Sequence, residues 1–177
     1  MTPSRRSILI ASCAAMATGS ARSQSVSAPN VVVISPRLVT SGQPSSSALA
    51  SIRQLGFDAV ICLVPATVLG TVKEEPELLA KQGVEFVYMP IPFNLPEEHH
   101  FLGTSAALDR LKTKKVLVHC EVNMRASSMV FLHRVIQGRE DPAHAYEAVA
   151  AVWSPRGPWR RLMEAQLSKH SINFEFY

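Results

Sequence analysis

The sequence has few cysteines and few charged residues, and both shortages limit what the protein can be. Its 177 residues include three cysteines and 18% charged residues, fewer charges than the roughly 25% of an average soluble domain. Three cysteines do not form a disulfide framework. A hydrophobic content of 47% is too high for a disordered tail and sufficient for a buried core. The length fits a single domain.

No apolar run is long enough to cross a membrane. The candidate nearest the N-terminus, residues 8–18, follows a pair of arginines and precedes small residues that end at Ser23. This order is typical of a secretory signal, and it resembles a twin-arginine export signal. We predict that residues 1–23 are a cleaved signal peptide and that residues 24–177 form the mature domain, which would be periplasmic or secreted. A lipoprotein processing site is disfavoured, because the apolar stretch before the first cysteine is too short.

The basic character of the chain comes mainly from this segment. The whole chain has a net charge of +4, but removing residues 1–23 removes Arg5, Arg6 and Arg22 and no acidic residue, which leaves +1. No basic stripe with interleaved aromatic residues remains to contact phosphates along a strand. We therefore expect no nucleic-acid partner and no stable membrane insertion after the signal is cleaved.

The mature chain alternates short apolar runs with helical patterns. Strands are expected at residues 31–34, 58–64, 84–89 and 116–118, and helices at residues 46–55, 76–82, 97–111, 126–136, 142–152 and 159–169. Strands that alternate with helices predict an α/β fold with a mostly parallel central sheet flanked by helices. Ligands of such sheets bind at the carboxyl ends of the strands.

One loop at such a strand end carries residues suited to nucleophilic chemistry. The strand at residues 116–118 is followed by His119 and Cys120, and Arg125 stands at the start of the next predicted helix. Free backbone N–H groups and the helix dipole at this position favour the thiolate of Cys120. The same amides form a cradle for a tetrahedral oxyanion, and a guanidinium donates two parallel hydrogen bonds to one. The sequence therefore predicts a nucleophile and an anion site in one short loop.

The segment VLVHCEVNMRAS, residues 116–127, resembles the His-Cys-(x)n-Arg phosphate-binding loop of the protein tyrosine and dual-specificity phosphatases. The Ser-Gly-Gln-Pro turn at residues 41–44 and the proline-rich loop at residues 90–96 look like those of bacterial phosphatases related to the beta-lactamase hydrolase-like group. The resemblance implies a three-layer cysteine phosphatase-like fold, phosphomonoesterase activity and no cofactor. The substrate would be a phosphorylated small molecule or a phosphoprotein.

The resemblance also implies roles for individual residues. By position, Cys120 would be the nucleophile that forms a phosphocysteine, Arg125 the phosphate clamp and Ser127 the hydroxyl that helps the thiolate leave. His119 would support the loop through hydrogen bonds of its ring. The phosphate would lie against the loop formed by Glu121, Val122, Asn123, Met124, Arg125 and Ala126.

The loop departs from the family pattern in its length and composition. Four residues separate Cys120 from Arg125, whereas the family usually has five. Four is also the spacing in rhodanese-type sulfurtransferases, whose cysteine carries a persulfide. The loop has no glycine, so Asn123 is the residue best suited to a positive φ, and we expect Glu121 to point away from a bound dianion. A rhodanese-like sulfurtransferase and a non-catalytic phosphate-binding module therefore remain alternative functions.

The general acid does not match the family pattern. The family usually has an aspartate after the second strand, but residues 90–96 contain none. The candidates that follow are Glu97, Glu98, His99 and His100, and we choose Glu97 as the acid. The same four residues also fit the acidic start of a helix with a solvated face.

The remaining cysteine has two interpretations. Cys62 lies on an expected strand that should neighbour residues 116–118, where an inert buried thiol is favoured over a reversible disulfide with Cys120. His119 and Cys120 are adjacent and lack a second ligand pair at zinc spacing, so we expect no metal site.

Overall fold

The protein is described by a computed structural model over residues 25–177. The predicted signal peptide, residues 1–23, and its cleavage site lie outside these residues. Within residues 25–177, no helix is both long and apolar enough to span a membrane.

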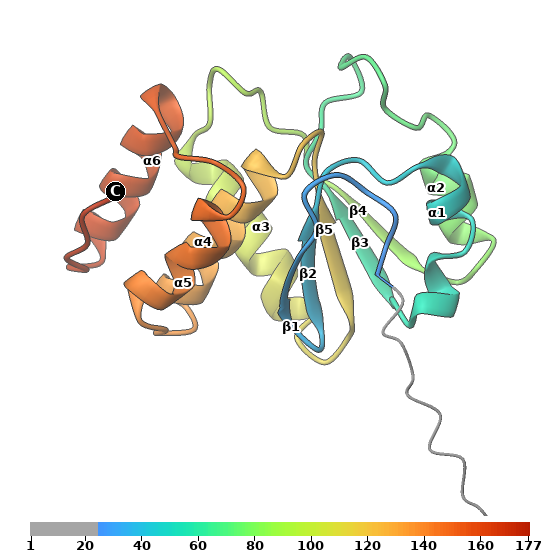
Figure 1. The fold of residues 1–177 in the computed structure, drawn as a ribbon, viewed down its shortest axis with the longest axis horizontal. Coiled ribbons are helices and arrows are strands. Elements are labelled where there is room, and N and C mark those ends of the chain that lie inside the picture. Colours follow the sequence, from blue (N-terminus) through green and yellow to red (C-terminus); the bar gives the residue numbers. More distant parts are fainter. Residues whose placement is uncertain (1–24) are drawn as a thin grey trace, which may run out of the picture.

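A five-stranded sheet forms the centre of the fold (Figure 1). Three of its strands run parallel to the central strand β5, and only β1 at one edge is antiparallel to its neighbour. All four residues of β5 are buried, as expected for a strand covered on both faces. In spatial order the strands are β1 (Val32–Ser35), β2 (Leu38–Ser41), β5 (Val116–His119), β3 (Ala59–Cys62) and β4 (Glu85–Tyr88).

Helices cover both faces of this sheet (Figure 1). One face carries the short helix α1 (Ser46–Leu49), the 3₁₀ helix η1 (Ile52–Leu55) and α2 (Glu75–Ala80). The opposite side carries the longer helices α3 (Glu98–Arg110), α4 (Met124–Ile136), α5 (Pro142–Ala150) and α6 (Gly157–Lys169).

The apolar core is divided by the sheet into two clusters. Side chains alternate between the faces of a strand, so Leu117 of β5 packs in the cluster on the α1 and α2 side. Val118 and Cys120 pack in the larger cluster that contains α4 and α6. These layers confirm the predicted α/β architecture with a mostly parallel sheet flanked by helices.

Two local predictions differ from the structure. The helix expected over residues 46–55 is wrong in its extent, because α1 ends at Leu49 and the chain continues as a 3₁₀ helix to Gly56, where φ is 83°. The strand β2 was not predicted, since it is a four-residue segment whose hydrogen bonds come from its partner β5 rather than from a strong local pattern.

The turn after β2 holds the loop that follows β5. The backbone N–H of Gln43 donates to the carbonyl oxygen of Glu121 (3.0 Å), and the N–H of Cys120 donates to the carbonyl oxygen of Ser41 (3.2 Å). Between these contacts, a Cβ atom on Gly42 would lie 2.8 Å from the carbonyl oxygen of Glu121 and 2.9 Å from Cβ of Pro29. Only glycine allows the two backbone segments to approach this closely.

Replacing Gly42 by alanine should therefore destabilise the protein. Because backbone atoms must move to admit the methyl group, we expect Gly42→Ala to lower the free energy of unfolding by about 1–3 kcal/mol in urea titrations. Thr67→Ala, at an exposed loop position, is the matched control and should leave the midpoint unchanged. Equal stability of Gly42→Ala and the wild type would contradict the close approach.

Candidate active site

Cys120 lies at the carboxyl end of the central strand and begins the loop that leads into α4. Its side chain is completely buried. The loop ends at Asn123, which precedes α4 with a φ of 73°, so the predicted positive φ at this residue is confirmed. The side-chain amide of Asn123 donates to the carbonyl oxygen of Asn30 (2.6 Å) and to the hydroxyl of Thr40 (3.1 Å). These bonds fix the loop to the β2 side of the sheet.

The loop presents backbone N–H groups that lack acceptors. Within residues 25–177, no protein oxygen accepts a hydrogen bond from the N–H groups of Glu121, Val122, Met124, Arg125 and Ala126. The first N–H groups of a helix have no partner within the helix, and curled groups of this kind bind anions. The predicted phosphate-binding segment thus offers a row of free donors next to Cys120.

Arg125 contributes a fixed cation beside these amides. Its side chain is almost completely buried, its Nε donates to the carbonyl oxygen of Ile91 (3.0 Å), and its guanidinium carbon lies 5.1 Å from the centre of the Phe93 ring. Both contacts come from the proline-rich loop after β4. The hydrogen bond through Nε leaves the two terminal nitrogens of the guanidinium for an anionic ligand.

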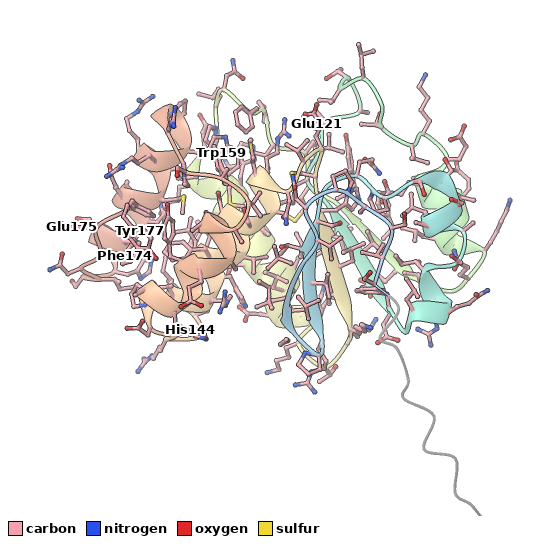
Figure 2. All side chains as sticks on the ribbon, in the orientation of Figure 1. Glu121, His144, Trp159, Phe174, Glu175 and Tyr177 are labelled. Atoms are coloured by element: carbon pink, nitrogen blue, oxygen red, sulfur yellow. The ribbon has the colours of Figure 1, made fainter. Side chains whose placement is uncertain are left out.

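Glu121 lies at the edge of the sheet where β5 ends (Figure 2), and 49% of its side chain is exposed. One carboxylate oxygen is 3.7 Å from Nη1 of Arg125. This distance is longer than a direct hydrogen bond. The carboxylate of Glu121 therefore makes only a weak ion pair with Arg125, which a bound dianion would replace.

The proline-rich loop is anchored by aromatic side chains. Nε1 of Trp159, at the start of α6, donates to the carbonyl oxygen of Phe93 (2.8 Å). The ring centres of Phe93 and Trp153 are 5.9 Å apart, and those of Phe93 and Trp159 are 5.8 Å apart. The aromatic contacts therefore hold the loop that positions Arg125.

Ser127 lies in the first turn of α4 and is buried. Its hydroxyl donates to the carbonyl oxygen of Met124 (3.2 Å). A role in assisting the thiolate would require the hydroxyl to turn from this carbonyl, and that role stays a prediction.

Glu97 is the N-cap residue of α3 and its side chain is exposed. Its carboxylate lies 3.2 Å from Nδ1 of His99, and its backbone N–H donates to Nδ1 of His100 (3.0 Å). Burial and the neighbouring His99 lower the pKa of His100, whereas Glu98 pairs with Lys169. Among the described residues, no hydrogen bond or ion pair joins Glu97 to the loop after β5, so the choice of acid stays a prediction.

His119, directly before the nucleophile, is fully buried. Its Nε2 lies 2.7 Å from a carboxylate oxygen of Glu75 in α2, and its Nδ1 lies 3.5 Å from the carbonyl oxygen of Cys120. Burial alone would lower the pKa of His119, but hydrogen bonds to Cys62 and Glu75 outweigh it and raise this pKa to about 10. Glu75 was not predicted as a partner of His119, because its only local signal is that of an acidic residue in the first turn of a helix.

Cys62 and Cys120, the cysteines within residues 25–177, are both free and buried. Cys62 lines a cavity of about 190 Å³ with Glu75 on the α2 side of the sheet, whereas Cys120 packs in the cluster of the opposite face. The sheet therefore separates the two side chains and no disulfide joins them, in agreement with the favoured interpretation of Cys62 as a buried thiol.

Among residues 25–177, potential ligand atoms gather within 4.8 Å of one another in two places. One is the buried group of Cys62, Glu75 and His119, and the other is the group of Glu97, His99 and His100. Neither group has the four-ligand set typical of structural zinc, and the hydrogen bond between Glu75 and His119 already pairs two members of the first. The expectation of no metal site stays a prediction.

Comparisons with known proteins support the fold. Neither a protein-family model nor a curated protein matches the chain. Among solved structures, the chain is similar to a DUF442 protein from Shewanella putrefaciens CN-32, provisionally named a phosphatase, with a TM-score of 0.74 and 27% identity over 81% of this chain and 95% of that one. It is similar to Tk-PTP in its active form, with a TM-score of 0.66 and 23% identity over 80% of this chain and 98% of that one. It is also similar to PTPMT1 in complex with PI(5)P, with a TM-score of 0.64 and 15% identity over 80% of this chain and 96% of that one. These structures confirm the predicted phosphatase-like fold and agree with the prediction of a phosphoric monoester hydrolase.

The raised pKa of His119 predicts how stability depends on pH. In the folded protein the pKa is about 10 instead of 6.5, so the folded state holds a proton that the unfolded state releases between these values. The stabilisation is complete below pH 6.5 and is lost as the pH rises through about 10, and it is on the order of 5 kcal/mol. His119→Asn should remove this slope from unfolding free energies measured by urea titration across the range. Parallel curves for wild type and variant would contradict the assignment.

Proposed function

We propose that this protein is an exported, cysteine-dependent phosphomonoesterase of the protein tyrosine phosphatase-like type that acts through a phosphocysteine. The observation that best supports this function is the loop after β5, which brings together Cys120, a row of unpartnered N–H groups and the side chain of Arg125. The similarity to the DUF442 protein, provisionally named a phosphatase, supports the same function.

In the first step, the thiolate of Cys120 attacks the phosphorus atom, and the bond from phosphorus to the leaving oxygen breaks. Charge on the transferring phosphoryl group spreads over its three other oxygens. The free N–H groups of the loop and the terminal nitrogens of Arg125 are fixed donors for these oxygens. Donors that are already in place stabilise the transition state without reorganising.

In the second step, water attacks the phosphorus of the phosphocysteine, the sulfur–phosphorus bond breaks, and inorganic phosphate leaves. Ser127 would donate its hydroxyl hydrogen bond to the departing sulfur after turning from the carbonyl of Met124. Glu97 would give its proton to the leaving oxygen in the first step and take one from water in the second. Each turnover thus restores the thiolate and the protonated acid.

The substrate in this proposal is a phosphorylated small molecule or a phosphoprotein. Phe93, with 40% of its surface exposed, lies against the guanidinium of Arg125. An aromatic ring at this position provides an apolar contact for an aryl group beside the bound phosphate.

A rhodanese-like sulfurtransferase is the second candidate, favoured by the four-residue spacing between Cys120 and Arg125. In that reaction Cys120 would take a sulfur atom from a donor such as thiosulfate, which releases sulfite, and would pass it to a thiophilic acceptor such as cyanide. In one reaction Cys120 would carry a phosphoryl group and in the other a sulfur atom, so assays of the two products distinguish them.

Assays of the full chain and of Cys120→Ser on p-nitrophenyl phosphate and on thiosulfate with cyanide test the proposal. The wild type should hydrolyse the phosphate ester, and the variant should lose this activity by at least about a thousandfold, because a hydroxyl is a far weaker nucleophile than a thiolate. Circular dichroism should show that the variant is folded.

Three results would count against the phosphatase. Full hydrolysis by Cys120→Ser would exclude the phosphocysteine. Thiocyanate formation without phosphate release would favour the sulfurtransferase. Binding of vanadate without any turnover would favour a phosphate-binding module.

The acid has its own test in Glu97→Gln. Because general acid catalysis typically contributes about a hundredfold or more, the variant should lose about that much kcat on phenyl phosphate, a substrate with a poor leaving group. It should lose much less on p-nitrophenyl phosphate, and the fall of kcat at high pH should disappear. Glu147→Gln, on the exposed surface of α5, is the control. A pH–rate profile of unchanged shape would exclude Glu97.

A further inference from the structure

A second thiol lies on the face of the sheet opposite the side chain of Cys120. Cys62 is the last residue of β3, and its register partners are His119 of β5 and Tyr88 of β4, each the last residue of its own strand. Residues in register on neighbouring parallel strands point to the same face of a sheet. The three side chains therefore form a row at the carboxyl end of the sheet, where α/β proteins bind ligands.

Two groups of opposite charge adjoin this thiol. Ligand atoms of Cys62, Glu75 and His119 lie within 4.8 Å of one another, and all three side chains are buried. A carboxylate oxygen of Glu75 lies 2.7 Å from Nε2 of His119. Burial lowers the pKa of His119, but the contacts with Cys62 and Glu75 raise it to about 10, so the ring is cationic near neutral pH. A cation beside a thiol favours the thiolate, which is the reactive form of cysteine.

A cavity of about 190 Å³ leads to this sulfur. Cys62 and Glu75 line it together with side chains that are mainly apolar, among them Val64, Val72 and Phe86. Tyr88 and Lys73 also line it and are exposed, so the cavity opens to solvent. An engineered protein cavity of about 150 Å³ binds benzene. The cavity beside Cys62 therefore has room for a body about the size of one aromatic ring.

These surroundings differ from those of a thiol in an apolar core, which behaves as a small inert hydrophobe. The hydrogen bond from Sγ of Cys62 to the carbonyl oxygen of Val64 is long, 3.9 Å, so it does little to hold the proton on sulfur. The sequence alone favoured an inert thiol, because Glu75 and His119 are distant from Cys62 along the chain and only the fold brings them together.

We propose that Cys62 is a second reactive thiol and that its cavity admits a small uncharged electrophile with an apolar body, such as an α,β-unsaturated carbonyl compound. Apolar walls favour such a compound over a charged one, because burying a charge in apolar surroundings is costly. The site is separate from Cys120, and its reaction does not depend on the proposed hydrolysis of phosphate esters.

The reaction is a conjugate addition in which Cys62 and His119 exchange one proton with the ligand. With the thiol proton held on His119, the thiolate sulfur forms a bond to the β carbon, and the electron pair of the carbon–carbon double bond moves to the carbonyl oxygen. The α carbon then takes the proton from His119. The product is a thioether on Cys62, and no oxidant or other reactant is consumed.

Alkylation by N-ethylmaleimide, an uncharged α,β-unsaturated imide, tests the proposal in the full chain at neutral pH. Trypsin cleaves after Arg53 and Lys73, so Cys62 is the one cysteine in the peptide of residues 54–73 and mass spectrometry follows it apart from Cys120. The same measurement in urea gives the rate for the unfolded chain. Because a free thiol is only a few per cent thiolate near neutral pH, Cys62 should react at least about tenfold faster in the folded chain.

A charged reagent tests the apolar cavity. The anion 3-maleimidopropionate carries the same reactive ring as N-ethylmaleimide. Its rate relative to that of N-ethylmaleimide should be at least about tenfold lower for the folded chain than for the unfolded chain, because an anion is costly to place among apolar side chains and near the carboxylate of Glu75. An equal ratio in the two states would overturn the assignment of the cavity as the binding site.

Two variants test the charge beside the sulfur. His119→Asn removes the cation, and Glu75→Gln removes the carboxylate that stabilises it, so each should slow alkylation of folded Cys62 by about tenfold or more. Glu147→Gln, on the exposed surface of α5, is the matched control and should leave the rate unchanged. If neither variant folds, the comparison of the folded and unfolded wild type decides alone. A folded-state rate no higher than the unfolded-state rate, or an unchanged rate in both folded variants, would overturn the inference and leave Cys62 an inert thiol.

Discussion

The central constraint on the structure is a set of backbone N–H groups, in the loop between β5 and α4, for which residues 25–177 provide no acceptor. Donors without partners are costly to keep near a buried segment unless a ligand satisfies them. The surrounding fold is built to hold them in place. The turn at Gly42 contacts the loop from the β2 side, Asn123 takes a positive φ, and Ile91 holds the side chain of Arg125. These contacts hold the loop in the form that the proposed site for one small oxyanion requires.

The charges around this loop are local rather than spread over the surface. The guanidinium of Arg125 is held by the carbonyl oxygen of Ile91, and His119, directly before the nucleophile, has Glu75 as the partner of its Nε2. Both cations are buried and held by hydrogen bonds. The predicted mature chain is nearly neutral, so in the proposed function the attraction for phosphate would depend on fixed groups of the loop and on the helix N-terminus rather than on a basic surface.

The sequence predicted correctly those features of the fold that depend on one continuous segment of the chain. The apolar run of β5, the alternation of strands and helices and the positive φ at Asn123 were all predicted from neighbouring residues. Features that depend on distant partners were missed. Strand β2 is defined by its pairing with β5, and Glu75 acquires its importance only because α2 places it 2.7 Å from His119, which is 44 residues away in the sequence. The general acid could not be identified from the sequence for the same reason. The contacts of Glu97 are with the first turn of α3, and none of them links it to the loop after β5.

The phosphocysteine is the step on which the whole account depends, and it can be observed directly. The full chain is mixed with p-nitrophenyl phosphate, quenched with acid within milliseconds and digested with trypsin, and the peptide of residues 116–125 is examined by mass spectrometry. The account predicts a phosphoryl group on Cys120 that appears during turnover and is absent after the substrate is exhausted. Hydrolysis of the ester with no phosphoryl group on this peptide at any time would contradict it.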